Sequence, residues 1–256
     1  MSVARAASDA FARVLAEPGS LAARHALLEA WRREGDPRGE LLEPQLAYHA
    51  TEQLALLEKL NVLIADQGRT FAGELATLVD GFTFHRGLVA EITVTGTSFL
   101  ALAPLVFRLA PIQHLTLRAP LPPVEELFGS RFLTKLVSLD MPTLGAAFGD
   151  RGAMALARSP HAQGLRWISL PGADIAEAGV EALAASPYLD GVRYLGLRDN
   201  PSDPTPYARE HDSRFDVGRP PLAIELERKF GVRPWLAVPT APEHWPPNRE
   251  ALAITP

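Results

Sequence analysis

The amino-acid sequence predicts an α/β fold in which short parallel strands stack as a solenoid, preceded by a helical N-terminal cap. Three observations support this prediction. A pattern of apolar residues, spaced apolar-x-x-apolar-x-apolar, occurs five times between residues 89 and 197. Apolar residues before residue 80 recur instead at helical spacing. At Asp80-Gly81 the spacing changes to the alternation typical of strands.

The five copies of the pattern define the repeat. They are Val89-x-x-Ile92-x-Val94, Ile112-x-x-Leu115-x-Leu117, Leu136-x-x-Leu139-x-Met141, Leu165-x-x-Ile168-x-Leu170 and Val192-x-x-Leu195-x-Leu197. The spacing between successive copies, roughly 23 to 29 residues, is typical of a leucine-rich repeat, whose units each contribute one strand to a curved stack. We therefore expect about five irregular units over residues 81–200, with the pattern residues in the core.

The N-terminal cap over residues 1–80 begins with two predicted helices. Ser8 is placed to cap a helix that ends near Glu17, because Pro18-Gly19 follows. Ser20 is placed to cap the second helix, which ends at Gly35.

Three more helices are expected in the cap. One covers about 38–49, with Pro44 imposing either a late start or a kink. Thr51 is expected to cap the next helix, and a last one is expected over about 70–79. Such a cap covers the open edge of the first strand, which otherwise invites aggregation.

A helix is predicted between strands in at least two of the repeats. Residues 152–160 (GAMALARSP) and 179–187 (GVEALAASP) align with each other over their whole length. Residues 201–256 form the third region. We expect a polar, Pro-rich loop over 201–221, a short helix from Leu222 to Phe230 stopped by Gly231, and a Pro-rich closing tail.

Composition excludes several classes of function. The chain has no cysteine, which removes disulfides, zinc–thiolate sites and thiol nucleophiles. The net charge is −5, whereas nucleic-acid binding requires clustered positive charge. No stretch approaches the roughly 18 apolar residues of a membrane helix, and the N-terminus lacks a signal-peptide pattern. We expect a soluble cytoplasmic protein that binds neither nucleic acid nor a membrane.

Side chains between the pattern residues are expected on the concave face of the stack. The first such column is Glu91, His114, Ser138, Trp167 and Tyr194. The second is Thr93, Thr116, Asp140, Ser169 and Gly196, and the third is Thr95, Arg118, Pro142, Pro171 and Arg198. Aromatic and arginine side chains are typical of protein-binding hot spots. The predicted partner-binding residues are Trp167, Tyr194, Arg118, Arg198, His114, Glu91 and Asp140. In the alternative interpretation, the C-terminal tail, with Trp235 and Trp245, covers the two rings.

Other polar residues have structural explanations. Asn200 lies where such repeats carry an asparagine, whose side chain satisfies backbone groups of the neighbouring turn. Asp36, Arg38 and Glu40 fit helix capping and dipole compensation, with a docking role for Arg38 as the alternative.

Catalytic and metal sites have weak support. Glu210-His211-Asp212 with Asp216 has metal-ligand residue types, but a charged loop explains this cluster equally well. His85 and His114 have no nucleophile in a recognisable motif. Arginines at 118, 166, 193 and 198 are interspersed with acidic residues, which favours a solvated face of mixed charge over a nucleic-acid site. We expect no cofactor, no metal and no catalytic residue.

Two segments resemble a known arrangement. The run Ala30-Trp31-x-x-Glu34-Gly35-Asp36-Pro37-Arg38-Gly39-Glu40, followed by Gln45-Leu46-Ala47, resembles the bacterial repeat-companion domain, a helical module that precedes leucine-rich repeats. Residues 84–94 (FHRGLVAEITV) resemble the link into those repeats, which are similar to the ribonuclease-inhibitor subtype. The similarity covers about residues 8–200 and the closing segment 226–235. Members of that family often carry an acidic residue before the Trp, where this chain has Ala30.

The resemblance implies an architecture and no established reaction. The function predicted from the sequence is a non-enzymatic module that binds a partner protein on the concave face. Two alternatives are a structural subunit that docks through its Pro-rich tail, and a metal-dependent hydrolase with its site in the 201–221 loop.

Overall fold

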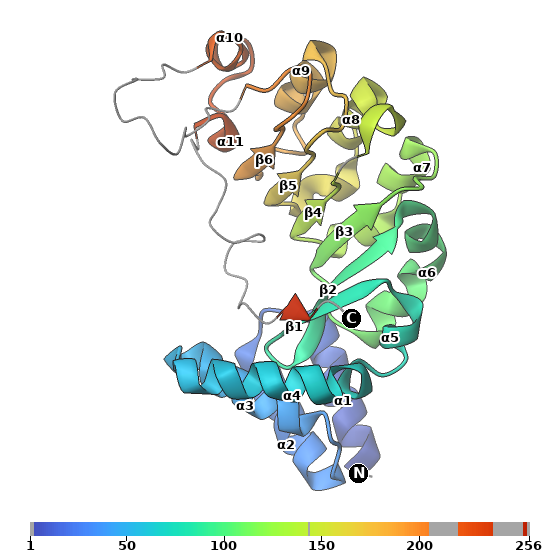
Figure 1. Cartoon of the computed structure of the whole chain (residues 1–256), viewed down its shortest axis with the longest axis vertical. Coiled ribbons are helices and arrows are strands. Elements are labelled where there is room, and N and C mark those ends of the chain that lie inside the picture. Colours follow the sequence, from blue (N-terminus) through green and yellow to red (C-terminus); the bar gives the residue numbers. More distant parts are fainter. Residues whose placement is uncertain (1–2, 143, 205–219, 238–252, 255–256) are drawn as a thin grey trace. The chain divides into compact units, whose positions relative to one another are not determined.

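The protein is an α/β chain that folds as two units, here described from a computed structural model (Figure 1). The structure describes residues 3–142, 144–204, 220–237 and 253–254. The first unit comprises residues 1–93, 102–113 and 248–256, and the second comprises residues 94–101 and 114–247.

The first unit consists of helices followed by a β-hairpin. Its elements are α1 (Val3–Ala16), α2 (Leu21–Glu34), α3 (Gly39–Thr51), α4 (Leu54–Ala72), α5 (Leu75–Leu78), β1 (Gly81–His85), β2 (Leu88–Thr95) and β7 (Ala253–Ile254). β1 pairs antiparallel with β2 and with β7. The core between α1, α2 and α3 is built around Leu27, Leu28 and Trp31, which are all 4 % exposed or less.

Helix ends in this unit confirm some predictions and correct others. The Ser20 hydroxyl accepts a hydrogen bond from the Ala23 N–H (3.2 Å), and Gly35 ends α2 with a positive φ of 69°. The prediction that Ser8 is a cap was wrong, because α1 already begins at Val3. Thr51 was also predicted wrongly: it is the last residue of α3, and its hydroxyl donates to the Ala47 carbonyl.

Two further boundaries differ from expectation. Pro44 lies inside α3, which begins at Gly39, so the proline does not delay the helix. The helix predicted over about 70–79 is divided between the end of α4 and α5, because Gly73 ends α4 with a φ of 58°.

A tight turn joins β1 to β2. It lies in one of the two segments that resemble the known family and makes a hydrogen bond to the other. His85 pairs with Leu88, and the intervening Arg86 and Gly87 have φ angles of 51° and 83°. Two successive positive φ angles are the signature of a type I′ turn. The Gly87 N–H donates to the side-chain carbonyl of Gln45 in α3, which is fully buried. A Cβ atom at residue 87 would overlap the backbone of Leu42, so only glycine fits this approach.

The second unit contains a parallel sheet, and the helices that connect its strands lie on one side of it (Figure 1). Its strands are β3 (His114–Arg118), β4 (Ser138–Asp140), β5 (Trp167–Ser169) and β6 (Tyr194–Gly196), paired in chain order. Between and after them lie α7 (Val124–Phe128), η1 (Arg131–Lys135), η2 (Gly145–Ala147), α8 (Gly149–Ala157), η3 (Pro160–Gly164), α9 (Glu177–Ala185), α10 (Pro221–Phe230) and α11 (Pro234–Ala237). One more helix, α6 (Gly96–Leu109), contributes residues to both units.

The apolar positions of the repeat pattern form the core of the second unit, as predicted. They are Leu115, Leu117, Leu139, Met141, Ile168, Leu170, Leu195 and Leu197, each 1 % exposed or less. Because strand side chains alternate, the residues between them lie on the sheet face opposite the helices α7–α9.

Candidate functional site

The strand register arranges the residues opposite the helices in two rows. The first row is His114, Ser138, Trp167 and Tyr194, and the second is Thr116, Asp140, Ser169 and Gly196. The residues of these two rows are called the polar face below. The register confirms the two columns predicted from the sequence for strands β3 to β6.

Three of the seven predicted binding residues lie outside these rows. Arg118 ends β3 and is exposed. Arg198 follows shortly after β6 and lies 3.4 Å from Asp199; both side chains are more than 70 % exposed. Glu91 lies in the part of β2 that belongs to the first unit, and it is partly buried.

The Tyr194 ring lies along its own strand, over Gly196. A Cβ atom added to Gly196 would approach the Tyr194 hydroxyl to 2.5 Å and the ring carbon Cε1 to 3.0 Å. Gly196 therefore leaves the space that the phenol occupies. The Tyr194 hydroxyl group therefore lies at the second row, over Gly196, which pairs with Ser169 on the neighbouring strand.

Asp140 is a partly buried carboxylate in that row. Burial raises the pKa of its carboxyl group, while hydrogen bonds from the Ser169 hydroxyl and the Met141 backbone N–H oppose the shift. Burial also raises the pKa of Tyr194, and the negative charge of Asp203 raises it further. The positive charge of Arg198 opposes that shift. Asp140 adds a smaller upward contribution to the pKa of Tyr194, so the two groups interact electrostatically.

A serine and a histidine are paired on the first row. His114 Nδ1 lies 2.7 Å from the Ser138 hydroxyl oxygen. Such a pair is the arrangement in which histidine activates a serine nucleophile. Ser138 is only 1 % exposed, however, so its hydroxyl is not accessible to a substrate in this structure. The sequence placed both residues in one column but gave no sign of the hydrogen bond.

Asn200 has the structural role predicted for it. Its side-chain oxygen accepts hydrogen bonds from the N–H groups of Ala173 and Ile175, both at 2.9 Å. Its amide group donates to the carbonyl oxygens of Leu170 (2.7 Å) and Leu197 (2.8 Å). The residue thus fixes the chain after β5 to the chain after β6.

The Asp36–Arg38 turn in the first unit is held by local contacts. Asp36 accepts hydrogen bonds from the Arg38 guanidinium and from the Arg38 backbone N–H (2.9 Å), and these bonds lower the pKa of the Asp36 carboxyl group. The guanidinium carbon also lies 4.4 Å from the ring centre of Trp31. The turn borders a cavity of about 230 Å³ that is also lined by Phe71 and Leu75. These contacts support the structural explanation of Asp36 and Arg38.

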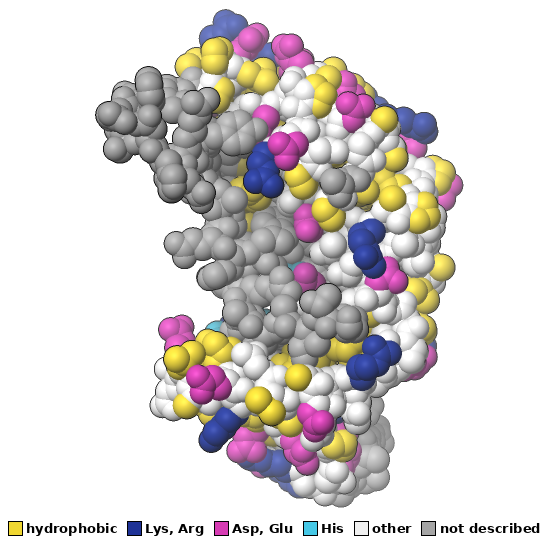
Figure 2. All heavy atoms as spheres, viewed as in Figure 1, with side chains coloured by type: hydrophobic (Ala, Val, Ile, Leu, Met, Phe, Trp, Pro, Cys, Tyr) yellow, Lys and Arg dark blue, Asp and Glu magenta, His cyan; other side chains and the backbone are white. Residues whose placement is uncertain are grey.

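Charged side chains are dispersed over the face that Figure 2 shows. Among the described residues on that face, Lys and Arg side chains lie between acidic and hydrophobic ones and form no continuous basic patch. No described helix is long and apolar enough to cross a membrane. Within the described ranges, no group of three or more His, Asp or Glu side chains is arranged to hold a metal ion. The Glu210-His211-Asp212 cluster and Asp216 lie outside those ranges.

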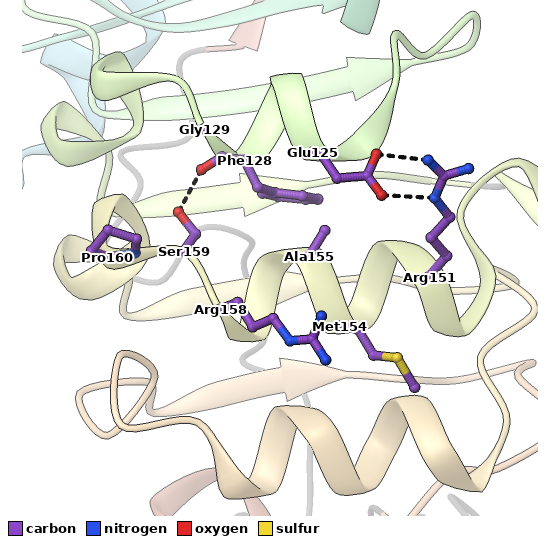
Figure 3. Close-up of a pocket in the computed structure, with 9 residues that line it drawn as sticks. All are labelled: Glu125, Phe128, Gly129, Arg151, Met154, Ala155, Arg158, Ser159 and Pro160. Carbon is purple, nitrogen blue, oxygen red and sulfur yellow. Dashed lines mark hydrogen bonds and ion pairs between the residues drawn. The ribbon is translucent and has the colours of Figure 1, made fainter.

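A groove on the helical side of the second unit is a separate surface (Figure 3). It has a volume of about 430 Å³ between α7 and α8, and its apolar lining includes Phe128, Met154 and Ala155. At its rim, Arg151 makes a two-pronged ion pair with Glu125 (2.7 and 3.0 Å). Both side chains are more than half exposed, so the pair adds little stability.

The short helix α11 bears on the alternative that the C-terminal segment covers the aromatic rings. α11 packs beside β6, and its Trp235 is only 2 % exposed. Trp245 lies outside the described residues.

Comparison of the chain with protein-family models, curated proteins and solved structures returned no match.

Proposed function

We propose that the protein is a non-enzymatic interaction module whose polar face binds a partner protein. The observation that carries the proposal is the pairing of Trp167 with Tyr194. They occupy matched positions on neighbouring strands, and both are partly exposed. Parallel strands lie about 4.8 Å apart, so the Cα atoms of the two residues are neighbours on this face. The Tyr194 ring extends over Gly196, and the two side chains are called the aromatic surface below.

The chemistry of this surface is that of a protein-binding hot spot. Trp, Tyr and Arg are the residues most enriched where a few side chains supply most of the binding energy. Here Arg198 lies just beyond the strand that carries Tyr194, and Asp140 lies on the other side of β5. Rings on short, hydrogen-bonded strands lose little conformational entropy on binding, which favours affinity.

We further propose that the second unit is a short leucine-rich-repeat solenoid, with the polar face on its concave side. Equivalent hydrogen bonds in successive segments support this. The Ser159 hydroxyl donates to the Phe128 carbonyl, and the Ser186 hydroxyl donates to the Ala157 carbonyl, both at 2.6 Å. Each serine thereby fixes the start of one segment to the end of the previous helix. An experimental structure in which one rotation relates successive segments would support the solenoid; unrelated rotations would contradict it.

Photo-crosslinking from single positions tests the proposed function. Benzoylphenylalanine replaces Trp167 on the polar face in one variant, and Met154 in the groove between α7 and α8 in the control. Crosslinks to another protein in native cells from residue 167 only support the proposal. The crosslinked protein is then identified by mass spectrometry and titrated in purified form.

Two results would contradict the proposal. Crosslinks from residue 154 alone would place the partner in the groove instead of on the polar face. Crosslinks from residue 167 to residues 238–256 of the same chain would instead support the alternative that the tail covers the rings.

A further inference from the structure

The polar face carries a partly buried carboxylate, Asp140, that no described cation neutralises. Its hydrogen-bond donors among the described residues are the Ser169 hydroxyl and the Met141 N–H. Arg198 lies 3.4 Å from the carboxylate of Asp199 and lowers the pKa of Tyr194, whereas no described cation contributes to the pKa shift of Asp140. Burial without a countercharge raises the pKa of the Asp140 carboxyl group, which means that its ionised form destabilises the fold.

The strand register places this carboxylate beside the aromatic surface. Asp140 pairs with Ser169 on β5, and Trp167 begins the same strand on the same face. From strand spacing and rise, the Cα atoms of Asp140 and Trp167 are about 8 Å apart, within reach of a ligand that touches both side chains. The Tyr194 ring, lying over Gly196, borders the opposite side of Ser169.

A carboxylate next to aromatic rings has the chemistry of a cation site. The carboxylate supplies a charge-assisted hydrogen bond, and a ring face attracts a cation through its quadrupole. A cation that arrives with a partner also supplies the countercharge that the described part of the chain lacks at Asp140. A neutral or acidic group supplies neither this countercharge nor the attraction of a cation to the ring face.

We propose that the polar face recognises a cationic side chain, an arginine or a lysine, on the partner protein, with Asp140 as its countercharge and Trp167 against its apolar stem or charged plane. This inference rests on the proposed function and specifies the chemistry of the partner. It assigns Asp140 to binding, while the aromatic pair supplies the apolar contact.

Titration with small probes of matched shape tests the inference. N-acetyl-arginine amide, N-acetyl-lysine amide and N-acetyl-citrulline amide are added to the ¹⁵N-labelled full chain, and the indole N–H signal of Trp167 is followed by NMR. Citrulline has the shape of arginine without its charge. We expect saturable shifts with arginine or lysine, and at least about 10-fold weaker binding of citrulline, a difference of about 1.4 kcal/mol. The stronger of the two cationic probes identifies the preferred group.

Two variants, each of which removes one negative charge, test where the cationic probe binds. We expect Asp140→Asn to weaken binding of the cationic probe about 10-fold or more. The control is Asp199→Asn, at a carboxylate whose side chain is 72 % exposed. It is expected to change binding less than about threefold, because solvent screens that charge. Equal binding of citrulline and arginine, or unchanged binding by Asp140→Asn, would overturn the inference.

The probe titration tests the cation site and the crosslinking experiment tests the proposed function, so either hypothesis can be refuted without the other. A partner crosslinked from residue 167, together with probes that do not bind, would leave the proposed function standing and refute the cation site. Charge-dependent probe binding without any crosslinked protein would support the cation site and count against a protein partner.

Discussion

Replacing Asn200 with alanine is expected to remove a large part of the stability of the second unit. The side chain makes four hydrogen bonds of 2.7–2.9 Å, and all four go to backbone groups of the chain after β5 and β6. A net contribution of about 0.5–1.5 kcal/mol for each bond gives a loss of about 2–6 kcal/mol in the free energy of unfolding. That is a large fraction of the roughly 5–15 kcal/mol that stabilises a typical domain.

Urea denaturation followed by circular dichroism measures this loss. The matched control is Asn61→Ala, because Asn61 is exposed on α4 and alanine favours helix. We expect the control to leave the free energy of unfolding unchanged or slightly raised. A loss below about 1 kcal/mol for Asn200→Ala would refute the reasoning, because it would mean that water replaces the side chain at little cost.

Three further predictions concern stability. Gly87→Ala should cost about 2–5 kcal/mol in urea denaturation, because of its positive φ and its overlap with the Leu42 backbone. Its control is Gly35, which has a left-handed φ of 69° but open space around it; Gly35→Ala should cost only about 1 kcal/mol. Asp140→Asn should raise the free energy of unfolding at neutral pH, because the folded state holds the ionised carboxyl group with a raised pKa. That gain should shrink as the pH falls through the folded-state pKa, where the parent carboxyl group takes up a proton; a gain independent of pH would contradict the assignment. Ser186 donates to the buried Ala157 carbonyl. Ser186→Ala should therefore cost about 2 kcal/mol in the same assay, since it leaves that carbonyl without its donor.

Strand positions and their register were predictable from the sequence because they depend on a short-range pattern. Alternation of apolar and polar residues fixes which side chains enter the core, and a slip of one residue would bury Asp140 and expose Leu139. The placement of Trp167 opposite Tyr194 therefore followed from the spacing of the pattern alone. The hydrogen bonds of Asn200 were predictable for the same reason, since they repeat a local turn.

Helix boundaries in the first unit were less predictable, because several residues compete for each cap. Thr51 has the side chain of an N-cap, yet it extends α3 by bonding to the carbonyl of Ala47, one turn earlier. Gln53 then precedes α4 without a side-chain capping bond, so tertiary packing outweighs local preference at this position.

The finer features of the polar face depend on side-chain placement that a sequence pattern does not specify. The position of the Tyr194 ring over Gly196 depends on a rotamer and on the absence of a Cβ atom. The His114–Ser138 bond likewise depends on rotamers across two strands. The burial of Asp140, which carries the inference about the partner, is a property of the assembled sheet.

The most direct test of the proposed function compares partner capture and stability for the same Trp167→Ala/Tyr194→Ala protein. The matched control is Ile224→Ala/Val232→Ala, two apolar side chains that are 54 % and 77 % exposed in and just after α10. We expect the first variant to lose the proteins captured by the parent chain from native lysate, as measured by quantitative mass spectrometry, while its thermal midpoint stays close to the parent value. The control should retain capture. Equal capture by both variants, or a collapse of the thermal midpoint of the first, would contradict the claim that the Trp167–Tyr194 pair is a binding surface.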